Sequence, residues 1–263
     1  LAKIPLHKSM ADRRELTVIA ALTLLIAVME ITGVPSVFFV NIQAADIEPF
    51  YFALMVNFLI IGVAAFLILR FLCPKWRLGF TKRGLAAGIK GYGILGGAAA
   101  LIGLIAFCIG LYPFDRQPSA AKVMVEGVIY YAGVALVEEL YVRGLLLNLI
   151  EKLLAGREDS TLIAVSASSV IFGAGHIFGV LGQPPLVIVG KVVWTVGMGM
   201  FFGMVYKKTG NLWLPVIIHF FVDICALPYC FSSMRGYAGL SLCILVPVYT
   251  ALGVYSFIQM KKA

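Results

Sequence analysis

The stretch VMVEGVIYYAGVALVEELYVRGLLLNLIEKLL, residues 123–154, decides the fold class of this chain. Its apolar length exceeds the about 20 residues that a helix needs to cross the hydrocarbon core of a membrane. It nevertheless carries Glu138, Glu139 and Arg143 well inside its ends. Ionisable groups at such positions are costly, and their presence favours a functional role. We therefore interpret this stretch as a membrane-spanning helix that carries part of a functional site.

Seven further stretches have the apolar character and length of a span. We predict eight spanning helices with short loops, at 16–40, 50–72, 85–112, 123–154, 162–178, 186–206, 212–231 and 240–260. The first exceeds the apolar region of a signal peptide, about 7–15 residues, and no clear A-x-A site follows it, so we keep it as a helix. The sequence thus predicts an all-α, polytopic membrane helical bundle of about eight transmembrane helices. Residues 1–263 are predicted to form a single integral membrane domain.

The overall composition agrees with a membrane protein. Of the 263 residues, 61% are hydrophobic and 13% are charged, against about 25% charged in a typical soluble domain. A water-soluble fold of this size cannot hide so much apolar surface, which excludes a disordered chain, a nucleic-acid-binding domain and a secreted module held by disulfides. The five cysteines lie in apolar stretches without C-x-x-C spacing, so we interpret them as small hydrophobic side chains.

The net charge of +8 is distributed unevenly between the two ends of the predicted helices. One set of connections carries 16 Lys and Arg residues, the opposite set carries 4, and Arg143 lies inside a span. Because cytoplasmic loops are enriched in Lys and Arg, we predict that both termini are cytoplasmic, in a prokaryotic plasma membrane. The basic charge is therefore a signal of topology, and we expect no nucleic-acid partner. The smaller set comprises Arg116, Lys122, Lys191 and Arg235.

The ionisable residues inside the spans gather in the second half of the chain. Neighbouring helical residues point about 100° apart, so Glu138 and Glu139 cannot address one point, whereas Glu139 and Arg143 share a face and can pair. Pairing would leave Glu138 free to face a cavity, where a desolvated carboxylate is a candidate general base. The alternative is a structural ion pair with a spare carboxylate. Glu30 and Glu126 lie nearer span ends, and we interpret them as interfacial or snorkelling groups.

Two of the three histidines also fall inside predicted spans. His176 ends the stretch FGAGH at residues 172–176, and a single histidine on an apolar helix is usually structural. His219 and Asp223 are four residues apart on one helix face, so their side chains can meet. That spacing suits an aspartate that orients an imidazole, or two groups that converge on one ligand. The alternative for this pair is a single hydrogen bond between helices.

Together these residues resemble the three motifs of the CAAX protease and bacteriocin-processing (CPBP, or Abi) family of intramembrane proteases. The matching positions are Glu138-Glu139-x-x-x-Arg143, then Phe172-x-x-x-His176, then His219-x-x-x-Asp223. The segments LYVRG at 140–144 and TGNLWLP at 209–215 look like the family's surroundings of the first and third motifs. The resemblance covers about 123–229, within a motif-bearing core of about 123–231, and three motifs in order make it specific.

The resemblance implies a fold of about eight spans whose motifs meet in a water-accessible cavity. By this resemblance, Glu138 would activate a water for attack on the scissile carbonyl, and His176 would help to hold that water. His219 and Asp223 would stabilise the tetrahedral oxyanion. We therefore expect an intramembrane endopeptidase, in contact with membrane lipid, that hydrolyses a peptide bond in a membrane-associated peptide or lipidated protein.

Two further positions follow from the resemblance. Glu139 and Arg143 would be the supporting pair. Asp223 stands where the family often has Asn, and an ionised Asp would repel an oxyanion instead of donating to it. Two arrangements would restore the donor: a protonated Asp223, or an Asp223 that orients His219 as an imidazolium.

Several alternatives stay open at this point. A Glu and two His could form a catalytic Zn²⁺ site, as in a metalloprotease. However, the motif H-E-x-x-H is absent and the groups come from three helices. We predict that no cofactor is required, with Zn²⁺ as the alternative. A non-catalytic immunity or regulatory scaffold could use the same fold. A proton-coupled transporter would predict inverted repeats, and the two halves do not correspond. The substrate alternatives are a prenylated C-a-a-X tail and a bacteriocin or signalling peptide, and no oligomeric state is predicted.

Overall fold

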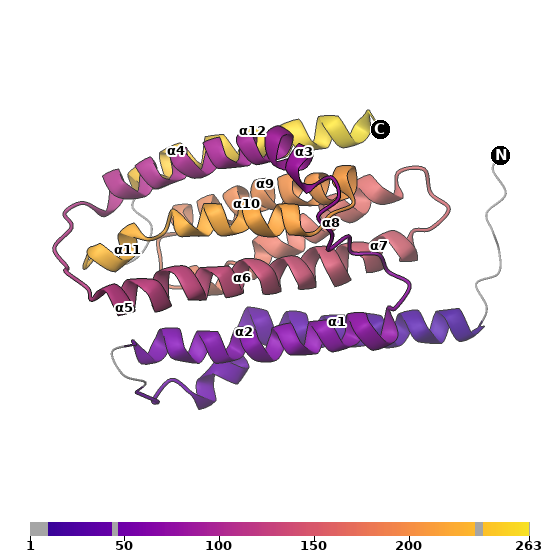
Figure 1. The fold of residues 1–263 in the computed structure, drawn as a ribbon, viewed down its shortest axis with the longest axis horizontal. Helices are drawn as coiled ribbons and strands as arrows, with labels where there is room; N and C mark the ends of the chain where they lie inside the picture. The colour runs from indigo at the N-terminus through magenta and orange to yellow at the C-terminus, as the bar shows by residue number, and fades with distance from the viewer. Residues whose placement is uncertain (1–9, 44–46, 235–238, 263) are drawn as a thin grey trace.

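The computed structural model describes residues 10–43, 47–234 and 239–262 and is built from helices (Figure 1). In the described residues, seven helical segments are long and apolar enough to cross a membrane. They are α1 Met10–Thr32; α2 Pro49–Leu67 with η2 Ile68–Leu72; α3 Leu85–Gly88, η3 Ile89–Gly93 and α4 Ile94–Leu111; α5 Ala120–Lys122, η4 Val123–Ile129, α6 Tyr130–Glu139, η5 Leu140–Leu147 and α7 Asn148–Leu153; α9 Pro185–Thr209; α10 Trp213–Ile224 with α11 Pro228–Phe231; and α12 Gly239–Lys261.

Two predicted spans are shorter than expected. The span predicted at 16–40 ends at Thr32, because Gly33 adopts a left-handed φ of 60° and the chain continues as the short η1 Val34–Phe38. The span predicted at 162–178 is α8 Ser160–Gly175, whose 16 residues extend about 24 Å, less than the about 30 Å of hydrocarbon. The chain then turns through η6 Phe178–Val180. Within the described residues, the apolar helical segments are therefore seven long ones and the shorter α8.

The helix α10 lies among three other long helices. In Figure 1, α4 and α12 form one edge, α1 and α2 form the other, and α6, α9 and α10 lie between them. The helix α10 packs against α4, α6 and α9, and α6 packs in turn against α2. Since α6 and α10 carry the first and third motifs, this contact brings residues 80 positions apart to one place.

Glycines allow α9 to approach its neighbours closely. A Cβ atom on Gly197 would lie 2.1 Å from the backbone oxygen of Tyr249 in α12. A Cβ atom on Gly199 would lie 3.0 Å from the Cβ of Ser169 in α8. Small residues of this kind are characteristic of helix contacts in membranes, because they let the backbones come close. The helix α9 is therefore fixed against both α8 and α12, on the side of the bundle that carries the second motif.

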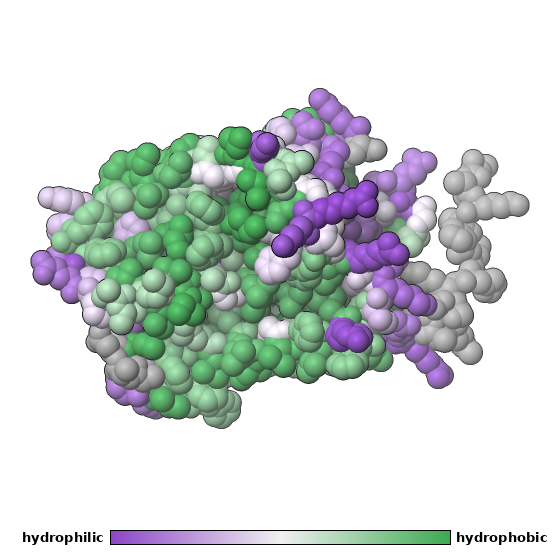
Figure 2. All heavy atoms as spheres, viewed as in Figure 1, coloured by the Kyte–Doolittle hydropathy of each residue, from purple (hydrophilic) through white to green (hydrophobic). Residues whose placement is uncertain are grey.

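The two ends of the bundle differ in polarity. The start of α1 and the end of α12 lie at the same end (Figure 1). Hydrophilic residues gather at that end, whereas most of the visible sides of the bundle are hydrophobic (Figure 2). Many large apolar side chains are exposed along the helices, among them Leu24, Leu59, Leu101 and Leu186, each at least 61% exposed. An apolar belt with a polar end is what a protein embedded in a bilayer requires, so the chain is an integral membrane protein.

Candidate active site

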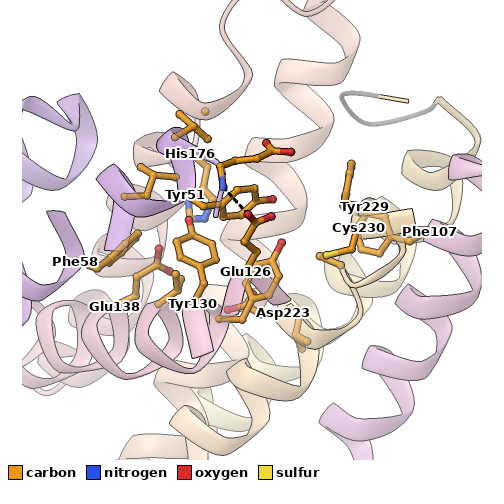
Figure 3. Close-up of a pocket in the computed structure, with 18 of the residues that line it drawn as sticks. Tyr51, Phe58, Phe107, Glu126, Tyr130, Glu138, His176, Asp223, Tyr229 and Cys230 are labelled. Atoms are coloured by element: carbon orange, nitrogen blue, oxygen red, sulfur yellow. Dashed lines mark hydrogen bonds between the residues drawn. The ribbon is translucent and has the colours of Figure 1, made fainter. Parts of the chain in front are cut away.

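A cavity of about 550 Å³ penetrates the bundle between α2, α6, α9 and α10 (Figure 3). Glu138, His176, His219 and Asp223 line its inner part. Three different stretches of chain supply them: the end of α6, the residue that follows α8, and α10. The four residues that the sequence singled out therefore face one cavity.

His219 is the centre of the closest group in this cavity. Its Nε2 atom lies 3.6 Å from Oε2 of Glu138 and 3.5 Å from Oδ2 of Asp223. Glu138 lies one residue before the end of α6, and Asp223 lies one turn after His219 on α10. The packing of α6 against α10 thus places two carboxylates on the same nitrogen of one imidazole.

The other face of His219 is held by a buried ion pair. Oε1 of Glu139 accepts hydrogen bonds from Nδ1 of His219 and from Nη1 of Arg143, each at 2.8 Å. Nη2 of Arg143 donates to the backbone oxygen of Gly199 in α9 at 3.1 Å. Glu139 and Arg143 are 0% and 1% exposed, so solvent does not compete for these bonds. The network joins α6, η5, α9 and α10 and fixes the orientation of the imidazole.

Aromatic rings enclose this network. The guanidinium of Arg143 lies 4.9 Å from the ring centre of Phe172 and 5.4 Å from that of Phe202. The ring of Phe202 also lies 4.9 Å from that of His219. A cation over an aromatic face is stabilised by the ring quadrupole, and the rings exclude water from the ion pair. The charge of Arg143 is therefore accommodated in the middle of the bundle.

His176 occupies a separate place on the cavity wall. It follows the last residue of α8, and its Nδ1 atom lies 2.8 Å from the backbone oxygen of Phe172. A carbonyl oxygen only accepts hydrogen bonds, so Nδ1 carries the proton that it donates. In the neutral ring, Nε2 is then an acceptor. His176 can therefore accept a hydrogen bond from a molecule in the cavity.

Two carboxylates of the cavity have an oxygen without a hydrogen bond. Oε2 of Glu138 and Oδ2 of Asp223 are buried and lack a hydrogen-bond partner in the part of the chain that the structure describes. Glu138 is 6% exposed. A buried polar atom that stays unsatisfied is costly and uncommon in folded proteins, so such an atom facing a cavity indicates a place for a bound group.

The residues do not fit a zinc site in this arrangement. Within the described residues, no three His, Cys, Asp or Glu side chains lie close enough together to hold a metal ion. A catalytic zinc site needs three protein ligands at about 2.0–2.2 Å from one point. We therefore derive no step through a metal.

Lys191 is a cavity residue that the sequence analysis missed, because it was counted with a loop. It lies on α9, is 9% exposed, and its Nζ atom lies 4.0 Å from the ring centre of Trp194. It lines the same cavity as Glu138, His176 and Asp223. The available signal was a single lysine between two apolar runs, in the stretch VIVGKVVW at 187–194.

Glu126 also contributes to the cavity and is more buried than expected. It was interpreted as an interfacial group, yet it is 3% exposed. Its Oε1 atom accepts a hydrogen bond of 2.7 Å from the backbone N–H of Glu48 (Figure 3) and lies 3.7 Å from Nζ of Lys122. Lys122 also pairs with the Glu48 carboxylate at 3.2 Å. These contacts tie the start of α2 to η4. Glu30, near the end of α1, is half-buried.

The family comparison agrees with this geometry. Residues 120–225 match the model of a protein family described as type II CAAX prenyl endopeptidase, Rce1-like. The resemblance to the CAAX proteases is confirmed. The matched segment is 106 of the 263 residues and includes all three motifs. It supports an intramembrane endopeptidase that acts on a peptide or protein substrate in a membrane. No curated protein and no solved structure matches the chain significantly.

Proposed function

We propose that the chain is a glutamate-type intramembrane endopeptidase that hydrolyses a membrane-associated peptide or protein without a metal. The observation that carries this proposal is the buried Oε2 atom of Glu138, which faces the cavity without a hydrogen bond, 3.6 Å from the imidazole of His219. Peptide hydrolysis requires a base for the water and preorganised donors for the developing charge. The two groups meet these requirements side by side.

In the proposed reaction, Glu138 takes a proton from a water molecule as the water attacks the scissile carbonyl carbon. The new carbon–oxygen bond converts the carbonyl oxygen into an oxyanion. Glu138 then returns the proton to the leaving nitrogen, and the carbon–nitrogen bond breaks. His176 supports the first step, because its Nε2 atom is free to accept a hydrogen bond from the same water once Nδ1 donates to Phe172.

The oxyanion is proposed to bind at Nε2 of His219. The Glu139 carboxylate accepts from Nδ1 and is itself held by Arg143, which favours a protonated imidazole whose Nε2–H can donate. An ionised Asp223 would repel the oxyanion, and two arrangements avoid this repulsion. Either Asp223 carries a proton and donates a hydrogen bond to the oxyanion, or its negative charge stabilises the imidazolium of His219 across 3.5 Å. Because Glu139 rather than Asp223 bonds to Nδ1, the orientation of the ring is assigned to Glu139.

The substrate is proposed to carry or contact an apolar chain in the membrane. A second cavity of about 650 Å³ lies beside the first, between α2 and α6, and its lining is almost entirely apolar. The two cavities share Phe58 and Tyr130. A lipid-modified C-a-a-X tail, the kind of substrate named in the family description, would place its chain there. A hydrophobic bacteriocin or signalling peptide is the other candidate.

The test compares the peptides released from membranes that contain the wild-type protein or the Glu138→Gln variant. Glu158→Gln, which removes a charge from an exposed loop, is the matched control. Fragments that appear with the wild type and the control, and are absent with Glu138→Gln, are expected. They would also define the cleaved bond. Identical peptide sets from all three membranes in the native host would contradict the proposal and favour a non-catalytic scaffold.

A further inference from the structure

The basic residues mark one end of the bundle, which we call the basic end. It consists of the start of α1, the connections 68–84, 154–159 and 210–212, and the end of α12. Of the 18 Lys and Arg residues in the described ranges, 14 lie in these segments or within two helical turns of them. The hydrophilic atoms in Figure 2 gather there. By the positive-inside rule, the basic end lies in the cytoplasm.

The catalytic cavity reaches the opposite end of the bundle, which we call the far end. The lining residues nearest that end come from the start of α2, the connection 112–119, η6 and the segment after α11. They are Glu48, Phe50, Arg116, Gly179, Ser232 and Met234. None of the described lining residues comes from the connections of the basic end. The described lining of the cavity therefore extends to the far end and not to the basic end.

Packed side chains close the route from the cavity to the basic end. All eight residues of η5, which continues α6 beyond Glu139, are buried. Arg143 lies within η5, between the rings of Phe172 and Phe202. A buried ion pair surrounded by aromatic rings is well packed and leaves no path for a peptide. The network that holds His219 therefore also forms the floor of the cavity.

We infer that the substrate enters the site from the non-cytoplasmic side of the membrane. The inference rests on the proposed function and specifies its substrate: a peptide segment of a secreted or membrane-anchored protein that is exposed on that side. The charges near the entrance are of both signs, since Glu48, Arg116 and Lys122 line it, which suits the polar backbone of a peptide. The apolar second cavity does not reach the motif residues and shares only Phe58 and Tyr130 with the first.

The depth of the cavity sets a minimum length for this segment. Glu138 lies 16 residues after Lys122 along one continuous helix, about 24 Å at 1.5 Å per residue. An extended chain covers at most about 3.3–3.6 Å per residue. About seven extended residues must therefore separate the scissile bond from any folded part of the substrate.

Thiol labelling in intact cells tests the side of entry without requiring catalysis. Cys230 lines the cavity, and the other four cysteines, Cys73, Cys108, Cys225 and Cys243, are replaced by alanine. A membrane-impermeant maleimide is expected to label Cys230 in intact cells. In a cysteine-free background, Arg116→Cys at the cavity entrance should behave in the same way. Arg157→Cys, in an exposed loop of the basic end, should react only after the cells are made permeable.

The opposite pattern would overturn the inference: Arg157→Cys labelled in intact cells, with Arg116→Cys protected until permeabilisation. Arg116→Cys decides the result if Cys230 is too buried to react. The labelling reports the side of the cavity even if the chain is not a protease. Its failure is therefore distinguishable from a failure of the proposed function.

A second arm measures cleavage from each side. The probe is a water-soluble quenched fluorescent peptide that contains the bond identified from the released fragments. Sealed right-side-out vesicles are expected to cleave it, and inverted vesicles are expected to leave it intact. Cleavage by inverted vesicles alone would overturn the inference. Cleavage only after detergent treatment would do the same, because it would point to lateral entry from the lipid.

Discussion

The two nitrogen atoms of His219 face two regions that differ in how their charges are satisfied. Behind Nδ1, Glu139 and Arg143 are almost fully buried and bonded to each other, to the imidazole and to a backbone oxygen. In front of Nε2, Glu138 is buried and Asp223 is partly buried, and neither carboxylate accepts a hydrogen bond from the described residues. On the network side, Oε2 of Glu139 and Nε of Arg143 also lack partners, but Oε1 of Glu139 accepts two hydrogen bonds and Arg143 donates two. Burial alone therefore does not distinguish a structural charge from a reactive one. The difference is whether the charged group is hydrogen-bonded at all: Glu139 and Arg143 are, whereas the carboxylates of Glu138 and Asp223 are not in the described residues.

This comparison is sharpest for two neighbouring residues of one helix. Glu138 and Glu139 have the same side chain and similar burial, yet they point to opposite sides of the imidazole. We expect variants on the cavity side to lose activity while they stay folded. Variants on the network side should lose stability first. The predictions below test this division.

The largest effect is expected for Glu138→Gln. The amide keeps the size of the side chain but cannot take a proton from water, so the cleavage rate should fall by about 10³-fold, within the range for removal of a general base. Its unfolding midpoint should stay at the wild-type value. Both are measured on purified protein in lipid nanodiscs, with Glu158→Gln as the control. If the Glu138→Gln protein cleaves at the rate of the control, Glu138 is not the general base, and the cavity side of His219 does not differ from the network side in function.

The next largest effect is expected for Arg143→Met, which should lower the free energy of unfolding. It leaves the Glu139 carboxylate buried beside a hydrophobic side chain, and breaking a buried pair in this way costs about 3–5 kcal/mol. Denaturant unfolding in detergent micelles measures the change. The double variant Glu139→Gln/Arg143→Met removes both charges and should regain most of the lost stability. If the double variant is as unstable as Arg143→Met, the loss does not come from an uncompensated charge.

The helix boundaries could be predicted from the sequence where the length of the apolar run determines them. Most span limits follow from apolar length, but the end of α1 depends on the left-handed backbone of Gly33, which the apolar run 34–40 conceals. The length of α8 depends on tertiary packing, since the apolar sequence continues beyond Gly175. Hydrophobicity alone therefore overestimates both spans.

The candidate site was predictable only within each helix. The spacing of Glu139 and Arg143, and of His219 and Asp223, shows that each pair shares a helix face. The bond between Glu139 and His219 joins residues 80 positions apart and depends on how α6 packs against α10, which no local pattern specifies. For the same reason, Lys191 could not be assigned to the cavity from its position in the sequence.

Two substitutions of Asp223 should reduce the cleavage rate to different extents. Asp223→Ala removes a group 3.5 Å from His219 and should reduce the cleavage rate by about 10²-fold, as the loss of one oxyanion contact does. Asp223→Asn supplies an amide that donates a hydrogen bond, so its rate should stay within about tenfold of the wild type. Steady-state rates with one peptide substrate decide between them. If Asn is as damaging as Ala, the carboxylate itself is required.

The smallest effect is expected from metal removal. Because the site residues do not form a three-ligand cluster in the described chain, a strong zinc chelator should leave the cleavage rate unchanged. The measurement compares purified enzyme before and after dialysis against the chelator, with and without added Zn²⁺. Loss of activity that Zn²⁺ restores would replace the metal-free mechanism with a zinc-dependent one.

The most direct test of the central claim is hydrolysis in water enriched in ¹⁸O, followed by mass spectrometry of the product and of the enzyme. If Glu138 activates a water that attacks the scissile carbonyl, one ¹⁸O atom should enter the new carboxylate of the product in a single turnover, and none should enter Glu138. Label in the Glu138 carboxylate, or an unlabelled product, would contradict this, because it would mean that Glu138 itself attacks the substrate.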